Sequence, residues 1–274
     1  MSTPFSITPC SPHLGAEIGD IDLTKPLDDE LRHALYATFA QYGVIFFRDQ
    51  NLSFDDMMRL AGYFGPVHIH TGGAGTASRP ADGYPAIRKQ HFDEKSARIS
   101  GEVWHSDQSC ADIPPDGSIL TQKIVPPNGG GDTLFLSAAA AYDGLSEPMK
   151  AFLEPLTAEH DGGQIFDKGK EAQYPRAIHP IVTRHPETGR KILFVNEGFT
   201  TRICELSKGE SAGVLRLLFE HLAKPQWQMR FRWRENSVAF WDNRSTQHYA
   251  IWDYWPNVRS GYRVQFEGKA RPAR

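Results

Sequence analysis

The spacing of apolar residues predicts an amphipathic helix over residues 27–43. Leu31, Leu35 and Phe39 recur every four positions, which places their side chains along one face of a helix. Acidic residues occupy the first turn, where the helix dipole favours negative charge, and Gly43 is placed to end the helix.

The next two predicted elements are a buried strand and a second helix. The strand is the apolar run at residues 44–48. The helix covers residues 53–65, with Ser53 as its N-cap and either Gly62 or Gly65 at its end.

Residues 71–90 are rich in Gly, Ser, Ala and Pro and show no sustained period, which predicts a long loop. Long loops in compact domains commonly carry function, and this one lies between two segments that contain histidines. We therefore expect an active-site lid around residues 71–101.

Short strands dominate the chain from residue 102 onward. The predicted strands are 102–107, 117–125, 133–137, 191–196, 229–234, 237–242 and 262–266. Two helical segments, 137–156 and 209–223, interrupt the series. Many short strands with helices outside them predict a mainly β, two-sheet antiparallel structure of jelly-roll type, formed by residues 1–274 as a single domain.

Composition narrows the class of protein. The chain has 274 residues, a net charge of −3 and a pI near 6.4, which gives no reason to expect nucleic acid as a partner. Its three cysteines form no CxxC pair, and no apolar run is long enough to cross a membrane. The N-terminus lacks the pattern of a signal peptide, so a cytoplasmic protein is expected.

Candidate chemistry begins with His105 and Asp107, which are two residues apart in a predicted strand and so point to the same side. Alone, this pair is weak evidence, because a hydrogen-bonded pair near the surface gives the same pattern. His248 lies far downstream, and two histidines with one carboxylate form the facial triad of non-haem Fe(II) oxygenases. A structural zinc site normally has four ligands, often thiolates, and the sequence has no cysteine cluster.

Two arginines and a threonine extend this hypothesis. Arg259 with the hydroxyl of Thr133 suits the far carboxylate of a dicarboxylate that chelates the metal at its other end. Arg263, four residues later, faces the same side if the segment is extended. A second cation is redundant for one carboxylate, but it makes sense if the substrate is itself an anion.

The sequence resembles the taurine dioxygenase (taurine/2,4-D type) family of Fe(II)- and 2-oxoglutarate-dependent dioxygenases. The resemblance runs from HLGAEIGDIDL to YRVQFEG, and its most specific segments are WHSD, GGDTLF, HPETGRKILFVNEGFTTRI and WDNRSTQHYAIWDY. It implies a double-stranded β-helix (a cupin-like jelly roll) that hydroxylates a C–H bond with Fe(II), 2-oxoglutarate and O₂, giving succinate and CO₂. It also implies a homo-oligomer, a dimer or a tetramer.

The resemblance assigns roles to eight residues. His105, Asp107 and His248 would be the iron ligands and catalytic centre, Thr133 and Arg259 would hold 2-oxoglutarate, and His70, Arg263 and Phe199 would bind the substrate. From the residues alone, His68 is as good a candidate as His70.

Two departures from the family pattern concern the substrate. Gly73 replaces a tyrosine and Gly101 an asparagine of the taurine enzymes, which removes polar contacts and opens volume. We expect a small anion bulkier than taurine: a sulfonate, a sulfate ester or a carboxylate. The alternatives are taurine itself, a desaturase or cyclase, a non-catalytic anion binder and a zinc hydrolase.

Overall fold

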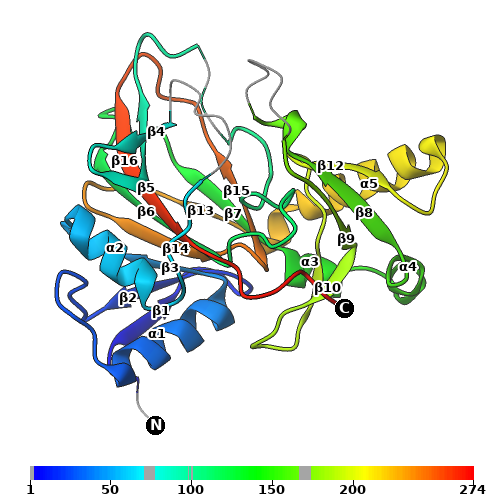
Figure 1. The fold of residues 1–274 in the computed structure, drawn as a ribbon, viewed down its shortest axis with the longest axis horizontal. Coiled ribbons are helices and arrows are strands. Elements are labelled where there is room, and N and C mark those ends of the chain that lie inside the picture. The colour runs from blue at the N-terminus through cyan, green and yellow to red at the C-terminus, as the bar shows by residue number, and fades with distance from the viewer. Residues whose placement is uncertain (1–2, 71–77, 98, 100, 167–173) are drawn as a thin grey trace.

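The computed structural model describes residues 3–70, 78–97, 99, 101–166 and 174–274. Its largest element is an eight-stranded sheet of order β1-β2-β3-β14-β6-β16-β5-β4 (Figure 1). The strands are β1 (Ser6–Pro9), β2 (Ala16–Gly19), β3 (Val44–Phe47), β4 (Ser78–Ala81), β5 (Tyr84–Phe92), β6 (Gly117–Ile124), β14 (Val238–Asp242) and β16 (Arg259–Phe266). All neighbours pair antiparallel except β2 and β3.

A three-stranded sheet packs against the large sheet. It contains β13 (Gln228–Phe231), β7 (Thr133–Ser137) and β15 (Thr246–Ala250), in the order β13-β7-β15. Phe231 of this sheet stacks on Phe46 of β3 at 3.9 Å between ring centroids, and Phe135 meets Trp241 of β14 at 5.9 Å. Two antiparallel sheets that share an aromatic core confirm the predicted jelly roll.

The outer face of the large sheet is covered by α1 (Asp29–Tyr42) and α2 (Phe54–Gly62). Phe39 of α1 stacks on Phe240 of β14 with ring centroids 4.3 Å apart. Gly43 ends α1 at φ 71°, as predicted, and Ser53 caps α2 within a capping box. Helix α2 ends at Gly62, one of the two predicted ends, and the next residue, Tyr63, is in a right-handed conformation.

The remaining elements form a second region beside the two sheets (Figure 1). They are the sheet β12-β8-β9 with strands Thr200–Ile203, Thr157–Asp161 and Arg176–Pro180, the hairpin β10 (Val182–Arg184) and β11 (Lys191–Leu193), and the helices α3 (Ala138–Asp143), α4 (Glu147–Leu153) and α5 (Lys208–Leu222). Leu136 and Leu218 are fully buried in the core they share. None of the helices described is long and apolar enough to span a bilayer.

Two predicted elements were wrong, and the predicted helical segment 137–156 is divided into α3 and α4. Residues 102–107 do not form a strand; His105 makes one isolated bridge to His248, and Asp107 lies in the turn that follows. Residues 78–92, predicted as loop, form the hairpin β4–β5, whose turn contains Gly83 at φ 76°. Polar side chains on β5 obscure the alternation of apolar and polar residues from which a strand is predicted. The rest of the expected lid falls partly on residues 71–77, 98 and 100, outside the described residues.

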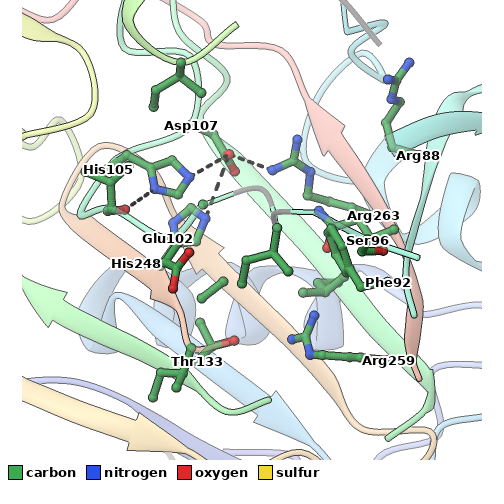
Figure 2. A pocket seen from close by; sticks show the side chains of 18 of the residues that line it. Arg88, Phe92, Ser96, Glu102, His105, Asp107, Thr133, His248, Arg259 and Arg263 are labelled. Atoms are coloured by element: carbon green, nitrogen blue, oxygen red, sulfur yellow. Dashed lines mark hydrogen bonds and ion pairs between the residues drawn. The ribbon is translucent and has the colours of Figure 1, made fainter. Parts of the chain in front are cut away.

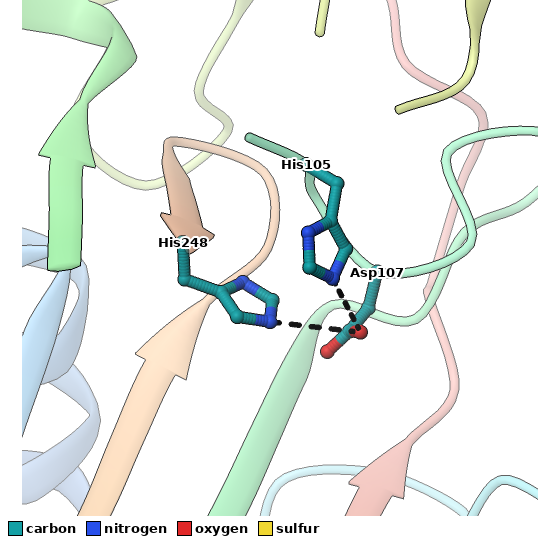
Figure 3. Close-up of side chains that lie close together, drawn as sticks. All are labelled: His105, Asp107 and His248. Carbon is teal, nitrogen blue, oxygen red and sulfur yellow. Dashed lines mark ion pairs between the residues drawn. The ribbon is translucent and has the colours of Figure 1, made fainter. Parts of the chain in front are cut away.

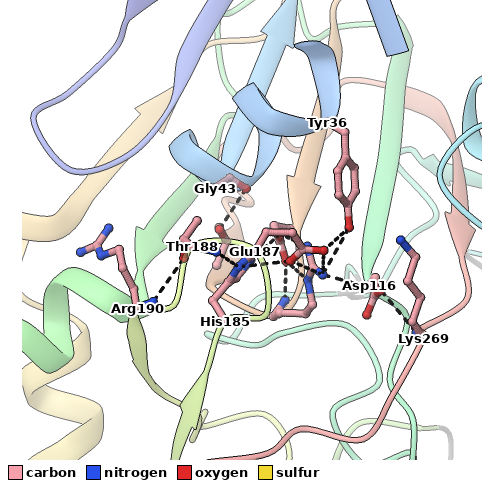
Figure 4. Close-up of polar contacts among 11 residues, drawn as sticks. Tyr36, Gly43, Asp116, His185, Glu187, Thr188, Arg190 and Lys269 are labelled. Atoms are coloured by element: carbon pink, nitrogen blue, oxygen red, sulfur yellow. Dashed lines mark hydrogen bonds and ion pairs between the residues drawn. The ribbon is translucent and has the colours of Figure 1, made fainter. Parts of the chain in front are cut away.

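A buried ionic network fixes the turn between β14 and β15 (Figure 4). Asp242 is fully buried and accepts hydrogen bonds from Arg244 Nε at 2.9 Å and His185 Nε2 at 2.9 Å. Arg244 NH1 also donates to Glu187 at 3.0 Å, which in turn accepts from the Tyr36 hydroxyl at 2.5 Å. This network joins α1 and the β10–β11 hairpin to the turn that leads into His248.

We predict that Arg244→Met lowers the free energy of unfolding by about 3–5 kcal/mol at neutral pH, because it removes the arginine paired with the buried Asp242 carboxylate. The control is Arg176→Met: Arg176 is 59% exposed in its pair with Asp161, and its loss should cost less than about 1 kcal/mol. Urea denaturation of both variants distinguishes the two cases.

The deficit of the Arg244 variant should also depend on pH. Burial by itself raises the pKa of Asp242, but Arg244 and His185 outweigh it and hold the pKa at about 2, below the unfolded value of 3.8. A depressed carboxyl pKa stabilises the fold above pH 3.8 and loses that contribution as the pH falls towards 2. The difference between wild type and variant should narrow over that window; a constant difference would contradict this account.

Candidate active site

Three residues from two distant parts of the chain meet at one point (Figure 3). One ligand atom each of His105, Asp107 and His248 lies within 4.8 Å of the others, and all three residues are buried. Asp107 Oδ1 is 3.9 Å from Nε2 of both histidines. The backbones of His105 and His248 exchange hydrogen bonds of 3.2 and 2.9 Å, which sets both imidazoles beside the carboxylate.

The two imidazoles are held in different ways. His105 Nδ1 lies 2.8 Å from the carbonyl of Val103, and since a carbonyl only accepts, Nδ1 carries the proton and Nε2 offers its lone pair. His248 is packed between Trp241, with centroids 4.8 Å apart, and Phe135 at 6.2 Å. Its Nδ1 has no hydrogen-bond partner among the described residues.

Polar side chains under Asp107 fix the orientation of its carboxylate. The Ser118 hydroxyl donates to Asp107 Oδ2 at 2.7 Å and accepts from Asn243 Nδ2 at 3.0 Å and Gln265 Nε2 at 2.9 Å. Both lone pairs and the proton of Ser118 are therefore used, and the hydroxyl cannot turn away. Asn243 Oδ1 also accepts from the Trp241 indole N–H at 2.9 Å.

The electrostatics favour the protonation states that ligate a cation. Burial lowers the pKa of both His105 and His248, which keeps the imidazoles neutral. Burial by itself raises the pKa of Asp107, but Arg263 and the two imidazoles outweigh it and hold the pKa below its ordinary value. Two neutral imidazoles and one carboxylate can hold a divalent cation on one face, as the metal hypothesis requires.

The triad opens into a cavity of about 770 Å³ (Figure 2). One wall of the cavity is a face of the paired strands β5 and β16, on which every second residue of each strand lies. Three cross-strand pairs occur in succession on this face: Phe92 with Arg259, Gln90 with Gly261, and Arg88 with Arg263. Since four residues of antiparallel strand span about 13 Å, the arginines of β16 stand at separate ends of the wall.

The Arg259 end has the features expected of a carboxylate site. Arg259 is 5% exposed and has no ion pair among the described residues. Its Nε donates to the Gly131 carbonyl at 2.9 Å, and NH1 and NH2 each reach the Gln122 side-chain oxygen at 3.1 Å in the amide orientation that satisfies both residues. Three of five guanidinium N–H donors are thereby used, and two remain.

Thr133 lines the same cavity as Arg259. Its hydroxyl oxygen accepts from the Trp233 indole N–H at 3.0 Å, which leaves its own proton to donate. The Arg259 guanidinium carbon lies 5.7 Å from the centre of the same indole ring. Trp233 therefore positions both residues at one end of the cavity.

The opposite end carries more positive charge than the sequence predicted. Arg263 NH1 donates to Asp107 Oδ1 at 2.6 Å, while its buried Nε has no partner among the described residues. Arg88, its cross-strand neighbour, lines the same cavity, as does His70. Burial, together with the charges of Arg263 and Arg88, lowers the pKa of His70 to about 4.

Of the two histidine candidates on the segment after α2, only His70 lines the cavity. His68 Nε2 instead lies 3.0 Å from the side-chain nitrogen of Gln108. Phe199 is 2% exposed and lines the cavity with its ring 6.4 Å from that of His105. The individual roles assigned to all eight candidate residues stay predictions.

Sequence reasoning missed Arg88 and Ser118. Arg88 could have been found only by recognising 84–92 as a strand, whose alternation places Arg88, Gln90 and Phe92 on one face. Ser118 carries no signal in the sequence, because its contact with Asp107 depends on how β6 packs under the turn.

Gly101 corrects the expectation that a glycine here simply opens volume. Its φ is +86°, and a Cβ at this position would lie 3.0 Å from Cε1 of His105. A side chain would therefore strain the backbone and press on the imidazole. The glycine allows the close approach of the chain to His105. Gly73 lies outside the described residues.

Comparison with known proteins agrees with this geometry. The family model described as "Taurine catabolism dioxygenase TauD, TfdA family" matches residues 6–265. The alkylsulfatase of Acinetobacter baylyi is 33% identical over 93% of this chain and 83% of its own length. The alpha-ketoglutarate-dependent sulfonate dioxygenase of Saccharomyces cerevisiae is 33% identical over 93% of this chain and 65% of its own length.

A solved structure is also similar. The crystal structure of a taurine dioxygenase from Burkholderia xenovorans matches with a TM-score of 0.83 at 33% identity, covering 97% of this chain and 91% of that one. The chain therefore belongs to the TauD/TfdA family. It is a 2-oxoglutarate-dependent dioxygenase, and the cofactors of its family are Fe(II), 2-oxoglutarate and O₂.

We predict that Ser118→Ala weakens binding of Mn(II), a redox-inert substitute for Fe(II), by about 10- to 100-fold, because Asp107 loses the donor that orients it. The control is Ser106→Ala. Ser106 is also buried and adjacent to Asp107 in sequence, but its hydroxyl donates to the Thr246 carbonyl instead. Titration followed by electron paramagnetic resonance gives both affinities, and equal losses would contradict the orienting role.

Proposed function

We propose that this dioxygenase hydroxylates a C–H bond of a small organic anion, a sulfonate or a sulfate ester, and releases succinate and CO₂. The observation that carries the proposal is one cavity with a His-Asp-His cluster and two separate cationic ends. The relatives named as a sulfonate dioxygenase and an alkylsulfatase support the same substrate class.

The metal site would be held by His105, Asp107 and His248, whose buried, neutral imidazoles and ionised carboxylate suit Fe(II). When bound, the metal with 2-oxoglutarate and O₂ supplies the oxidising power that breaks a C–H bond. The protein's own residues position the co-substrate and the substrate and limit the access of water.

Arg259 and Thr133 would bind the distal carboxylate of 2-oxoglutarate. Two free guanidinium donors and one free hydroxyl converge there, and a buried arginine without an ion pair gains most from an anion. About 13 Å of strand separates Arg259 from Arg263, so one small anion does not occupy both ends.

Arg263 would bind the anionic group of the substrate, with Arg88 and His70 beside it. A metal cation at Asp107 would satisfy that carboxylate and free the Arg263 guanidinium for a second anion. Arg88 and Arg263 are directly opposed on neighbouring strands, so two positive charges lie at this end of the cavity. Phe199 would pack against the organic part of the substrate.

The product follows from where the anion is attached. If the hydroxylated carbon carries the sulfonate, its C–S bond breaks and an aldehyde and sulfite leave. A sulfate ester oxidised at the same position gives an aldehyde and sulfate. The cavity of about 770 Å³ supports a substrate bulkier than taurine.

We further propose that residues 1–274 act as one catalytic domain, in the cytoplasm and as a homo-oligomer, and that the part of residues 71–101 outside the β4–β5 hairpin serves as its lid. The three cysteines are free, which agrees with a reducing compartment. Light scattering of the purified protein would test the oligomer.

The class of substrate is tested by succinate release over a panel of alkyl sulfonates, alkyl sulfates, taurine, aryloxy acids and uncharged controls. We expect sulfonates or sulfates to exceed the substrate-free rate at least tenfold, with one sulfite or sulfate formed per succinate. Stimulation by the uncharged controls alone, or by none of the compounds, would contradict the proposal.

Arg259→Gln and Arg263→Gln should separate the two cationic ends. We expect Arg259→Gln to raise the KM for 2-oxoglutarate about 100-fold and to change the substrate KM little, because a buried charge-assisted contact is lost. Arg263→Gln should do the reverse. Arg202→Gln is the control, since Arg202 is 51% exposed and outside the cavity. Equal effects of both variants on both KM values would refute the assignment.

A further inference from the structure

The hydroxyl of Tyr254 is a buried polar group without a partner. Tyr254 is 1% exposed, its ring packs with Phe92 and Ile99, and its hydroxyl makes no hydrogen bond among the described residues. A buried hydroxyl without a hydrogen-bond partner is unfavourable. Tyr254 also lines the cavity of the active site, which gives the hydroxyl access to a ligand.

Tyr254 stands at the Arg259 end of that cavity. A Cβ placed on Gly131 would lie 3.2 Å from the Tyr254 ring and 2.9 Å from Cδ of Arg259, so the two side chains meet across this glycine. The preceding residue, Asp253, accepts a hydrogen bond of 2.7 Å from the Gly131 backbone N–H. The tyrosine is therefore anchored to the same loop that holds Arg259.

We propose that the Tyr254 hydroxyl donates a hydrogen bond to the distal carboxylate of 2-oxoglutarate, as a third contact beside Arg259 and Thr133. A carboxylate offers about four lone-pair sites. Two guanidinium N–H groups and the Thr133 hydroxyl fill three of them, and the tyrosine hydroxyl completes the set. This inference rests on the proposed function in assuming that the diacid binds at the Arg259 end.

The protonation state of Tyr254 agrees with a donor role. Burial raises the pKa of the phenol to about 12, although the nearby Arg259 charge acts in the opposite direction. The hydroxyl therefore keeps its proton at neutral pH and can donate it to an anion.

The test is Tyr254→Phe, which removes the hydroxyl and keeps the ring. We measure two quantities on anaerobic, Mn(II)-loaded protein: the thermal midpoint without ligand, and the Kd for 2-oxoglutarate by calorimetry. We expect the midpoint to stay equal or rise, because an unsatisfied buried group is lost, and the Kd to rise about tenfold. The Kd for 2-oxobutyrate, which lacks the distal carboxylate, should not change.

The matched control is Thr121→Val. Thr121 also has a buried hydroxyl that finds no partner in the described part of the chain, but it does not line the cavity. This variant should keep or raise the midpoint in the same way and leave the Kd for 2-oxoglutarate unchanged.

Three outcomes would overturn the inference. A lower midpoint with an unchanged Kd would give Tyr254 a structural role only. Equal losses of affinity for 2-oxoglutarate and 2-oxobutyrate would place the hydroxyl at the wrong end of the ligand. If wild-type protein loaded with Mn(II) binds no 2-oxoglutarate, both the proposed function and the tyrosine contact are refuted. If the wild type binds 2-oxoglutarate and Tyr254→Phe binds it equally well, only the tyrosine contact is refuted.

Discussion

The active site depends on one buried negative charge, the carboxylate of Asp107. A carboxylate at 4% exposure is costly unless its surroundings compensate it, and this molecule compensates it from three directions. Arg263 supplies a full charge at 2.6 Å, Ser118 supplies a hydroxyl fixed by its own partners, and the two imidazoles present their nitrogens. The same arrangement keeps the carboxylate ionised and leaves room for a cation beside it.

The sheet beside this charge separates two cationic ends of the cavity. Strand β16 carries Arg259 and Arg263 on one face, and its neighbour β5 adds Arg88 opposite the second of them. Trp233 and Gln122 hold Arg259 in a fixed orientation, whereas Arg263 is paired with Asp107, which is also a candidate metal ligand. The Arg259 side chain is thus held by neutral groups, whereas the Arg263 side chain is held by a carboxylate.

Much of the fold could be predicted from periodicity. The helix at 27–43 and the strands around Phe135, Phe240 and Val264 have strong apolar patterns, because their side chains enter the aromatic core. The hairpin β4–β5 escaped prediction, since one face of β5 is lined with polar side chains that serve the cavity. The segment at 102–107 was predicted as one of the short strands. In the structure its two ligand candidates, His105 and Asp107, are brought together by one isolated bridge and a turn.

The sequence by itself determined the candidates for the chemistry: two histidines, one aspartate and the arginines of the last strand, in an order and context that resemble one family. Only the tertiary structure decided which polar groups surround them. The places of Ser118, Arg88 and Tyr254 near the cavity result from packing between segments that are not adjacent in sequence. The hydrogen bond of Ser118 to Asp107, 11 residues away, and the cross-strand pair of Arg88 with Arg263 produce no periodic pattern in the sequence. Contacts of that kind are set by the register of the sheets, which local sequence patterns do not encode.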